Sequence, residues 1–175
     1  MNANKDWALI EGVTTSKFTT SFEDNRGTYN EIFNLKSDPS YEFKQISVVH
    51  NKENILRGMH GDWGTTKKIS VISGEVIQVL LDCRVNSKTY GQYKSSILSA
   101  EDELLITIPS GVANGFQVIG KSAIYLYLQN TFYGDFKQFT VTPHDKCLSG
   151  AFNLSSETII SPRDNDRKKT LKNVN

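Results

Sequence analysis

One histidine in the middle of the chain has the surroundings of an acid–base group. His60 lies between Gly58 and Gly61 in the segment RGMHGD. Arg57 precedes it, and Lys67 follows it by seven residues. Glycines beside a polar residue let the backbone bend and leave room next to its side chain. An imidazole presented in this way can take up a proton near neutral pH, although a surface histidine on a bulge would give the same pattern.

Short stretches rich in β-branched and aromatic residues surround this segment, and turn residues separate them. The pattern predicts a hairpin over residues 67–84 that turns at Ser73-Gly74, and two strands separated by a turn within residues 7–20. Further strands are predicted over 29–33, 43–50, 94–98, 104–108, 112–120, 122–130 and 138–142. The polar tail over 161–175 is expected to fray. No long apolar run has a helical period, so the chain is predicted to be all-β, a sandwich or a barrel.

Alternation within the strands separates one lysine and one set of tyrosines from their neighbours. In the run KKISV, Lys67 shares a face with alternate apolar residues, which directs it inward and Lys68 outward; the opposite register would bury Lys68. In SAIYLYLQN, an aliphatic face suits a core. Tyr125 and Tyr127 share the other face, which suits a pocket wall or packed tyrosines with satisfied hydroxyls.

The composition is typical of one folded domain, residues 1–175. Hydrophobic residues make up 38% and charged residues 22% of the chain, which is enough for a core. The formal net charge of +1 gives no field that would attract nucleic acid. No signal peptide or apolar run of about 18–20 residues is present, and two cysteines are too few for a disulfide framework. We therefore expect a cytoplasmic protein with no nucleic-acid or membrane partner.

The polar residues favour metal-free chemistry. A metal-binding cupin is a small β-barrel with a His-x-His pair and a further histidine in a second motif, and this chain has Asp62 and Asn114 at the corresponding places. A neutral His60 could instead remove a proton next to a carbonyl, and Lys67 could stabilise the resulting negative oxygen. A tyrosine from another strand could carry a proton on the opposite side of the ligand.

Several segments together resemble the dTDP-4-dehydrorhamnose 3,5-epimerases and their relatives that act on other nucleotide-linked 4-keto sugars. From about Thr20 to Asp164, in the family's order, they are DNRGTYNEIF, FKQISVV, ILRGMHGD, SGEVIQVLLDCR, NSKTYG, LSAEDELLITIPSGVANGF, AIYLYLQNTFY and SPRD. The resemblance implies a cupin-type double-stranded β-helix, or jelly-roll. It also implies a homodimer that needs no metal or organic cofactor and makes sugars for capsules, lipopolysaccharide or O-antigen.

The resemblance also implies roles for individual residues. His60 matches the base that removes a proton next to the C4 ketone, and Asp164 matches its paired carboxylate. Lys67 matches the group that stabilises the enolate oxygen. Tyr127, rather than Tyr125, matches the tyrosine that returns a proton on the other face.

Substrate-binding residues are implied in the same way. Arg57 resembles an arginine whose planar fork suits a diphosphate, and Gln45 matches another pocket residue. Arg26, Tyr29 and Glu31 resemble residues of an N-terminal arm that helps to line a site, with the partner subunit's site as one possibility.

Three positions depart from the family's usual pattern. Gly61 and Asp62 replace an aromatic residue and a glutamine. We expect the first change to open space and the second to add a carboxylate for sugar hydroxyls. This variant resembles the branch that acts on GDP-linked 4-keto heptoses. Asn114 replaces a common histidine, and an amide keeps hydrogen bonding but cannot titrate near neutral pH.

The sequence thus predicts an epimerase of a nucleoside-diphosphate-linked 4-keto sugar that inverts C3, C5 or both through an enolate. Tyr127 favours double inversion, while Asn114 keeps a C3-only epimerase open. A 3,4-ketoisomerase and a non-catalytic sugar-nucleotide-binding cupin are the remaining alternatives. The retained pair His60 and Asp164 argues for an enzyme.

Overall fold

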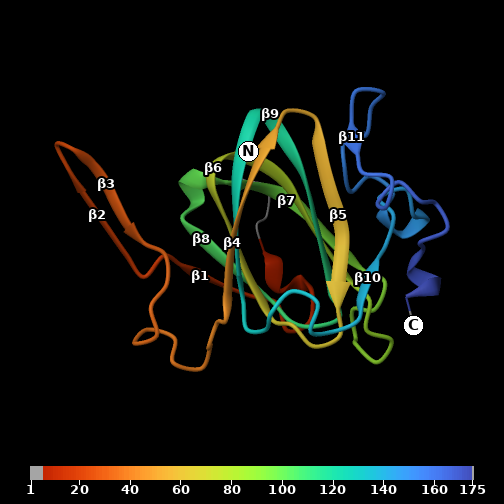
Figure 1. The fold of residues 1–175 in the computed structure, drawn as a ribbon, viewed down its shortest axis with the longest axis horizontal. Helices are drawn as coiled ribbons and strands as arrows, with labels where there is room; N and C mark the ends of the chain where they lie inside the picture. Colours follow the sequence, from red (N-terminus) through yellow and green to blue (C-terminus); the bar gives the residue numbers. More distant parts are fainter. Residues whose placement is uncertain (1–5, 175) are drawn as a thin grey trace.

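The computed structural model describes residues 6–174, and this part of the chain is built almost entirely of β-strands (Figure 1). The elements in order are the 3-10 turn η1 (Trp7–Leu9), β1 (Thr14–Lys17), β2 (Thr20–Asp24), β3 (Gly27–Glu31), β4 (Gln45–Lys52), β5 (Ile55–Asp62), β6 (Lys67–Asp82), β7 (Tyr93–Ser99), η2 (Ala100–Asp102), β8 (Leu104–Ile108), β9 (Val112–Gln129), β10 (Gln138–Thr140), η3 (Lys146–Leu148), β11 (Ile159–Ile160) and η4 (Leu171–Asn173). No helix of the described residues is long and apolar enough to cross a membrane.

Two long antiparallel strands, β6 and β9, hold the barrel together. They pair with each other over nearly their whole lengths, and each takes a different second partner along its two halves. The first half of β6 pairs with β8 and its second half with β7, while β9 pairs first with β5 and then with β4. The sheet therefore folds over itself around an apolar interior (Figure 1). The predicted all-β jelly-roll is confirmed.

The segment predicted as a hairpin with a turn at Ser73-Gly74 is one continuous strand, so that prediction is wrong. The register between β6 and β9 shifts on either side of Ser73, which marks a bulge within the strand. Gly74 has a φ of +77°, and a Cβ there would lie 2.3 Å from the Ser122 carbonyl oxygen. The same glycine signal that predicts a turn can thus mark a bulge and bend in a long strand.

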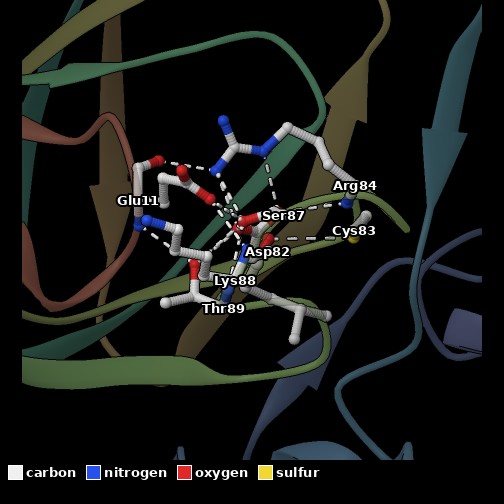
Figure 2. Close-up of polar contacts among 8 residues, drawn as sticks. Glu11, Asp82, Cys83, Arg84, Ser87, Lys88 and Thr89 are labelled. Atoms are coloured by element: carbon white, nitrogen blue, oxygen red, sulfur yellow. Dashed lines mark hydrogen bonds and ion pairs between the residues drawn. The ribbon is translucent and has the colours of Figure 1, made fainter.

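The first predicted strand is also replaced, because Trp7 to Leu9 form a 3-10 turn. The Trp7 side chain is 1% exposed and packs in the barrel interior. A polar cluster fixes the segment that follows it to the loop after β6 (Figure 2). In this cluster Arg84 donates to Asp82 and to the Glu11 carbonyl oxygen, and the one hydroxyl proton of Ser87 is shared between the carboxylates of Asp82 and Glu11. The cluster therefore ties the N-terminal segment to the barrel.

A loop covers the outer face of the barrel next to β9, and an arm precedes it in the chain. The arm is the hairpin β2–β3, which projects away from the barrel (Figure 1). The loop after it places Phe33, Tyr41 and Phe43 over Leu126 and Leu128. The aliphatic face of β9 therefore packs outside the barrel, and the tyrosine face points to its interior.

The C-terminal tail is ordered, in contrast to the predicted fraying. Leu171 and Val174 are buried in an apolar cluster with Phe139 and other residues of the sheet. The Leu171 amide donates to the Asp145 carboxylate (2.8 Å), and Thr142 donates to the Lys169 carbonyl oxygen (2.7 Å). Two apolar side chains in a polar sequence are enough to hold this segment once the sheet gives them a surface.

Candidate active site

The strand β5 carries His60 between β9 and β10, with Asn114 and Thr140 as its neighbours across the two pairings. Gly58, two residues earlier, has a φ of +117°, and a Cβ there would lie 2.5 Å from the Gly115 Cα. Glycine is required by this close approach of β5 to β9. The Gly58 amide is then free to donate to the Asp164 carboxylate (3.2 Å).

The imidazole of His60 is held by a carboxylate that lies 104 residues later in the chain. His60 Nε2 is 2.7 Å from Asp164 Oδ1. The Asp164 side chain is 3% exposed and that of His60 is 32% exposed. Burial alone would raise the pKa of Asp164, but the hydrogen bond and charge of His60, with the Gly58 amide, lower it to about 2. The carboxylate stays ionised and stabilises the imidazolium that forms when His60 takes up a proton.

Arg163 is a site residue that the sequence analysis missed. Its Nη2 lies 2.6 Å from His60 Nε2 and 3.3 Å from Nδ1, and its Nε donates to Asp164 Oδ1 (3.1 Å). Arg163 therefore shares the negative charge of Asp164 with the imidazole. The sequence feature that could have identified Arg163 is its position directly before Asp164 in the segment SPRD.

A cavity of about 310 Å³ opens beside His60. Seven residues predicted for the site line it: His60, Lys67, Tyr127, Gln45, Arg57, Asp62 and Asn114. Arg163 and an aromatic group in the loop after β9, formed by Phe132, Tyr133 and Phe136, line it as well. Asp164 does not line the cavity and binds His60 from behind. The predicted arm residues Arg26, Tyr29 and Glu31 lie on β2–β3 or its turn, away from this cavity.

The two lysines at the start of β6 have different surroundings. Lys67 lines the cavity, as the alternation predicts for an inward-facing residue. Lys68 lies outside the barrel but is 5% exposed, because the covering loop places Asp38 2.9 Å from its Nζ and the Tyr41 ring 4.8 Å away. The choice of Lys67 as the cavity lysine therefore agrees with its position.

Asp62 has protein partners for both of its carboxylate oxygens. Oδ1 accepts from the amides of Gly64 (3.1 Å) and Thr65 (2.6 Å), and Oδ2 is 3.2 Å from Lys67 Nζ. Burial opposes ionisation, but the charge of Lys67 and these hydrogen bonds together lower the pKa of Asp62. Asp62 thus forms the turn after β5 and orients Lys67, and it also lines the cavity for which the sequence predicts a carboxylate.

Gly61 does not leave open space, so that expectation is wrong. A Cβ at Gly61 would lie 2.3 Å from Phe139 Cζ on β10. The Phe139 ring packs against Trp63 with a centroid distance of 5.1 Å. An aromatic residue from a neighbouring strand therefore occupies the space beside position 61.

Tyr125 and Tyr127 play different parts in the barrel interior. Tyr125 is fully buried and stacks on Phe116 at 4.2 Å between ring centroids. Tyr127 reaches the cavity, where its hydroxyl accepts a hydrogen bond from Asn114 Nδ2 (3.4 Å). Burial raises the pKa of Tyr127, against smaller opposite effects of Arg57 and Asn114. Tyr127 therefore keeps its proton at neutral pH and can donate it.

Metal ligands are not grouped in this region. Within residues 6–174, no cluster of three or more histidine, cysteine, aspartate or glutamate side chains could hold a metal ion. The cavity brings together a base, cations and a neutral phenol.

Comparisons with known proteins agree with this arrangement. The family model described as dTDP-4-dehydrorhamnose 3,5-epimerase matches residues 8–172. A protein of that name from Shigella flexneri is 32% identical over 136 residues, which cover 73% of this chain and 75% of the relative. A relative of the same name from Neisseria gonorrhoeae is 29% identical, and the match covers 82% of this chain but only 45% of that longer protein.

Solved structures give the same result. The epimerase of Legionella pneumophila in complex with dTDP-4-keto-L-rhamnose superposes with a TM-score of 0.84 at 28% identity, over 93% of this chain and 89% of that one. ChmJ, a 3'-monoepimerase from Streptomyces bikiniensis in complex with dTDP-quinovose, gives a TM-score of 0.84 at 25% identity, over 93% and 85%.

Proposed function

The chain belongs to the dTDP-4-dehydrorhamnose 3,5-epimerase family, and we propose that it inverts carbon centres next to the ketone of a nucleoside-diphosphate-linked 4-keto sugar. The observation that carries this proposal is the buried Asp164 behind His60, at the wall of a cavity that Lys67 and Tyr127 also line. A surface histidine has no need of such a partner. The pair is what a catalytic base requires.

The geometry supports a mechanism in two proton transfers. His60 takes the proton from the carbon next to C4, and the electron pair moves to the C4 oxygen to form an enolate. Lys67, held by Asp62, stabilises that negative charge. The enolate carbon then takes a proton from the Tyr127 hydroxyl on its other face, which inverts the centre. Arg57 and Gln45 line the same cavity and are proposed to bind the diphosphate end.

The number of centres inverted is a finer part of the proposal. We favour inversion of both C3 and C5, because the proton donor Tyr127 is in place. Inversion of C3 alone is the second candidate, since the Asn114 amide that contacts Tyr127 cannot relay a proton to it and ChmJ is a monoepimerase.

We further propose that the whole chain is one domain of a cytoplasmic homodimer. The names of the relatives support a dTDP-linked substrate. The Gly61-Asp62 variant keeps a GDP-linked sugar, including a heptose, as the alternative. The arm supports the dimer, because Arg26, Tyr29 and Glu31 do not reach the cavity of their own chain.

Deuterium exchange tests the proposed function. The protein is incubated in D₂O with dTDP- and GDP-linked 4-keto sugars, and NMR locates the deuterium and the configuration of each centre. Label at both C3 and C5 is expected with one of the substrates. Label at C3 alone would show that the protein is a C3 monoepimerase. No label with any substrate would favour a non-catalytic sugar-nucleotide-binding protein.

A further inference from the structure

A series of hydrogen bonds crosses the barrel interior and ends at Tyr127. The Tyr125 hydroxyl donates to Gln78 Oε1 (2.5 Å), Gln78 Nε2 donates to Asn114 Oδ1 (2.6 Å), and Asn114 Nδ2 donates to the Tyr127 hydroxyl (3.4 Å). Gln78 and Tyr125 are completely buried and do not line the cavity. Gln78 reaches the site through Asn114, whereas Tyr125 also packs against the Tyr127 ring, with 4.9 Å between the ring centroids.

The backbone fixes the orientation of the Gln78 amide. Its Nε2 also faces the carbonyl oxygens of Val79 (3.1 Å) and Gly115 (3.2 Å), so its two N–H groups are shared among these oxygens and Asn114 Oδ1. A backbone carbonyl can only accept, so the NH₂ end of Gln78 must face these two oxygens. Its oxygen then faces Tyr125, whose hydroxyl must be the donor.

The orientation of Gln78 in turn decides that of Asn114. Because Gln78 presents an N–H, the atom of Asn114 that faces it must be Oδ1, and Nδ2 must point to Tyr127. This contact is the one hydrogen bond of the Tyr127 hydroxyl found among residues 6–174. The oxygen of Tyr127 is thus an acceptor toward the protein, and its proton is left for the cavity.

We propose that Gln78 is a positioning residue that, by orienting Asn114, keeps the Tyr127 proton directed at the enolate. This role rests on the proposed function. When the new C–H bond forms, the O–H bond of Tyr127 breaks, and the phenolate oxygen keeps the hydrogen bond from Asn114. Neither amide can give up or take up a proton near neutral pH. Tyr127 is therefore reprotonated through the cavity and not through the barrel interior.

The test separates proton removal by His60 from proton return by Tyr127. Deuterium incorporation that leaves the configuration unchanged reports the first step, and inversion reports both. The test variant is Gln78→Met combined with Tyr125→Phe, because the Tyr125 hydroxyl lies 3.4 Å from Asn114 Oδ1 and could replace Gln78 as its donor. Tyr125→Phe alone is the matched control, since the two carbonyls still orient Gln78.

The ratio of inversion to exchange should fall at least about tenfold in the double variant and stay within about threefold of wild type in the control. A role in folding alone would lower both rates together. An unchanged ratio of inversion to exchange, whether both rates fall equally or neither falls, overturns the role of Gln78. Wild-type protein that shows no exchange with any substrate overturns the proposed function itself.

A second variant tests the orientation at position 114 without changing the size of a buried side chain. Asn114→Asp has the same shape, but its second oxygen can only accept a hydrogen bond from the Tyr127 hydroxyl, which turns the phenol proton away from the cavity. Circular dichroism should show wild-type folding, and inversion should fall by at least about tenfold relative to exchange. Inversion at the wild-type ratio would overturn the proposal.

Discussion

At the scale of single residues, the imidazole of His60 is proposed to be the group that removes the substrate proton. His60→Asn removes the base while it keeps a polar side chain of similar size. Exchange of substrate deuterium should fall below detection, with thermal unfolding close to wild type. His50→Asn is the matched control, because His50 is exposed on β4 and away from the cavity. Substantial exchange by His60→Asn would mean that another group is the base.

The carboxylate of Asp164 determines how well that base works. Asp164→Asn replaces the ionised partner with a neutral amide, which cannot stabilise the imidazolium. The exchange rate should fall by about 100-fold or more. Because the pKa of Asp164 is about 2, its protonation should not contribute to the rate between pH 5 and 9. A loss of wild-type activity with a midpoint between pH 5 and 9 that disappears in Asp164→Asn would contradict this assignment.

At the scale of elements, the packing of β10 on β5 excludes a side chain at position 61. Gly61→Tyr should displace the Phe139 ring and destabilise the protein by about 1–3 kcal/mol, as overpacking usually does. Phe139→Ala in the same protein makes room for the new ring and should restore much of the stability. Thermal unfolding of the two single variants and the double variant measures this coupling. Additive losses would show that the two positions do not compete for space.

The polar cluster at the end of β6 gives the fold a stability term that depends on pH. Burial would raise the pKa of Asp82, but hydrogen bonds from Arg84, Ser87 and Thr89 lower it to about 2. A lowered pKa stabilises the fold above the unfolded value near 4, and this contribution is lost as the pH falls toward 2. Asp82→Asn should therefore cost about 2 kcal/mol at pH 7 and little at pH 2. Urea unfolding at the two pH values checks this, and an equal loss at both would contradict it.

At the scale of the whole molecule, the arm is proposed to serve the partner subunit. Tyr29 on the arm is 65% exposed and lies outside the cavity of its own chain. Tyr29→Ala and His60→Asn should each lower activity as separate proteins. After unfolding and refolding as a mixture, half of the dimers are mixed, and each has one site with both residues intact. Activity should recover to about a quarter of wild type. No recovery in a mixture that forms dimers would show that each arm serves its own chain.

The sequence by itself determined the fold class and part of the set of residues that face the site. Alternation favours an inward Lys67 and puts Tyr127 on the opposite face from the aliphatic residues of its strand, because successive side chains of a strand point to opposite sides. The family resemblance then connected them with His60 and Asp164, which local patterns could not do. These two residues are 104 positions apart, and no spacing rule acts over that distance.

Only the tertiary structure decided what lies next to each of these residues. Gly74 could mark a turn or a bulge until the pairing of β6 with β9 was known. Gly61 suggested open space, and Phe139 from a later strand fills it. The tail was predicted to fray, and the sheet supplies the apolar surface that buries Leu171. The orientation of Asn114 depends on Gln78, which a different part of the chain brings into contact. In each case local backbone preference is a property of a few neighbouring residues, whereas packing and hydrogen bonding depend on partners that only the folded barrel brings together.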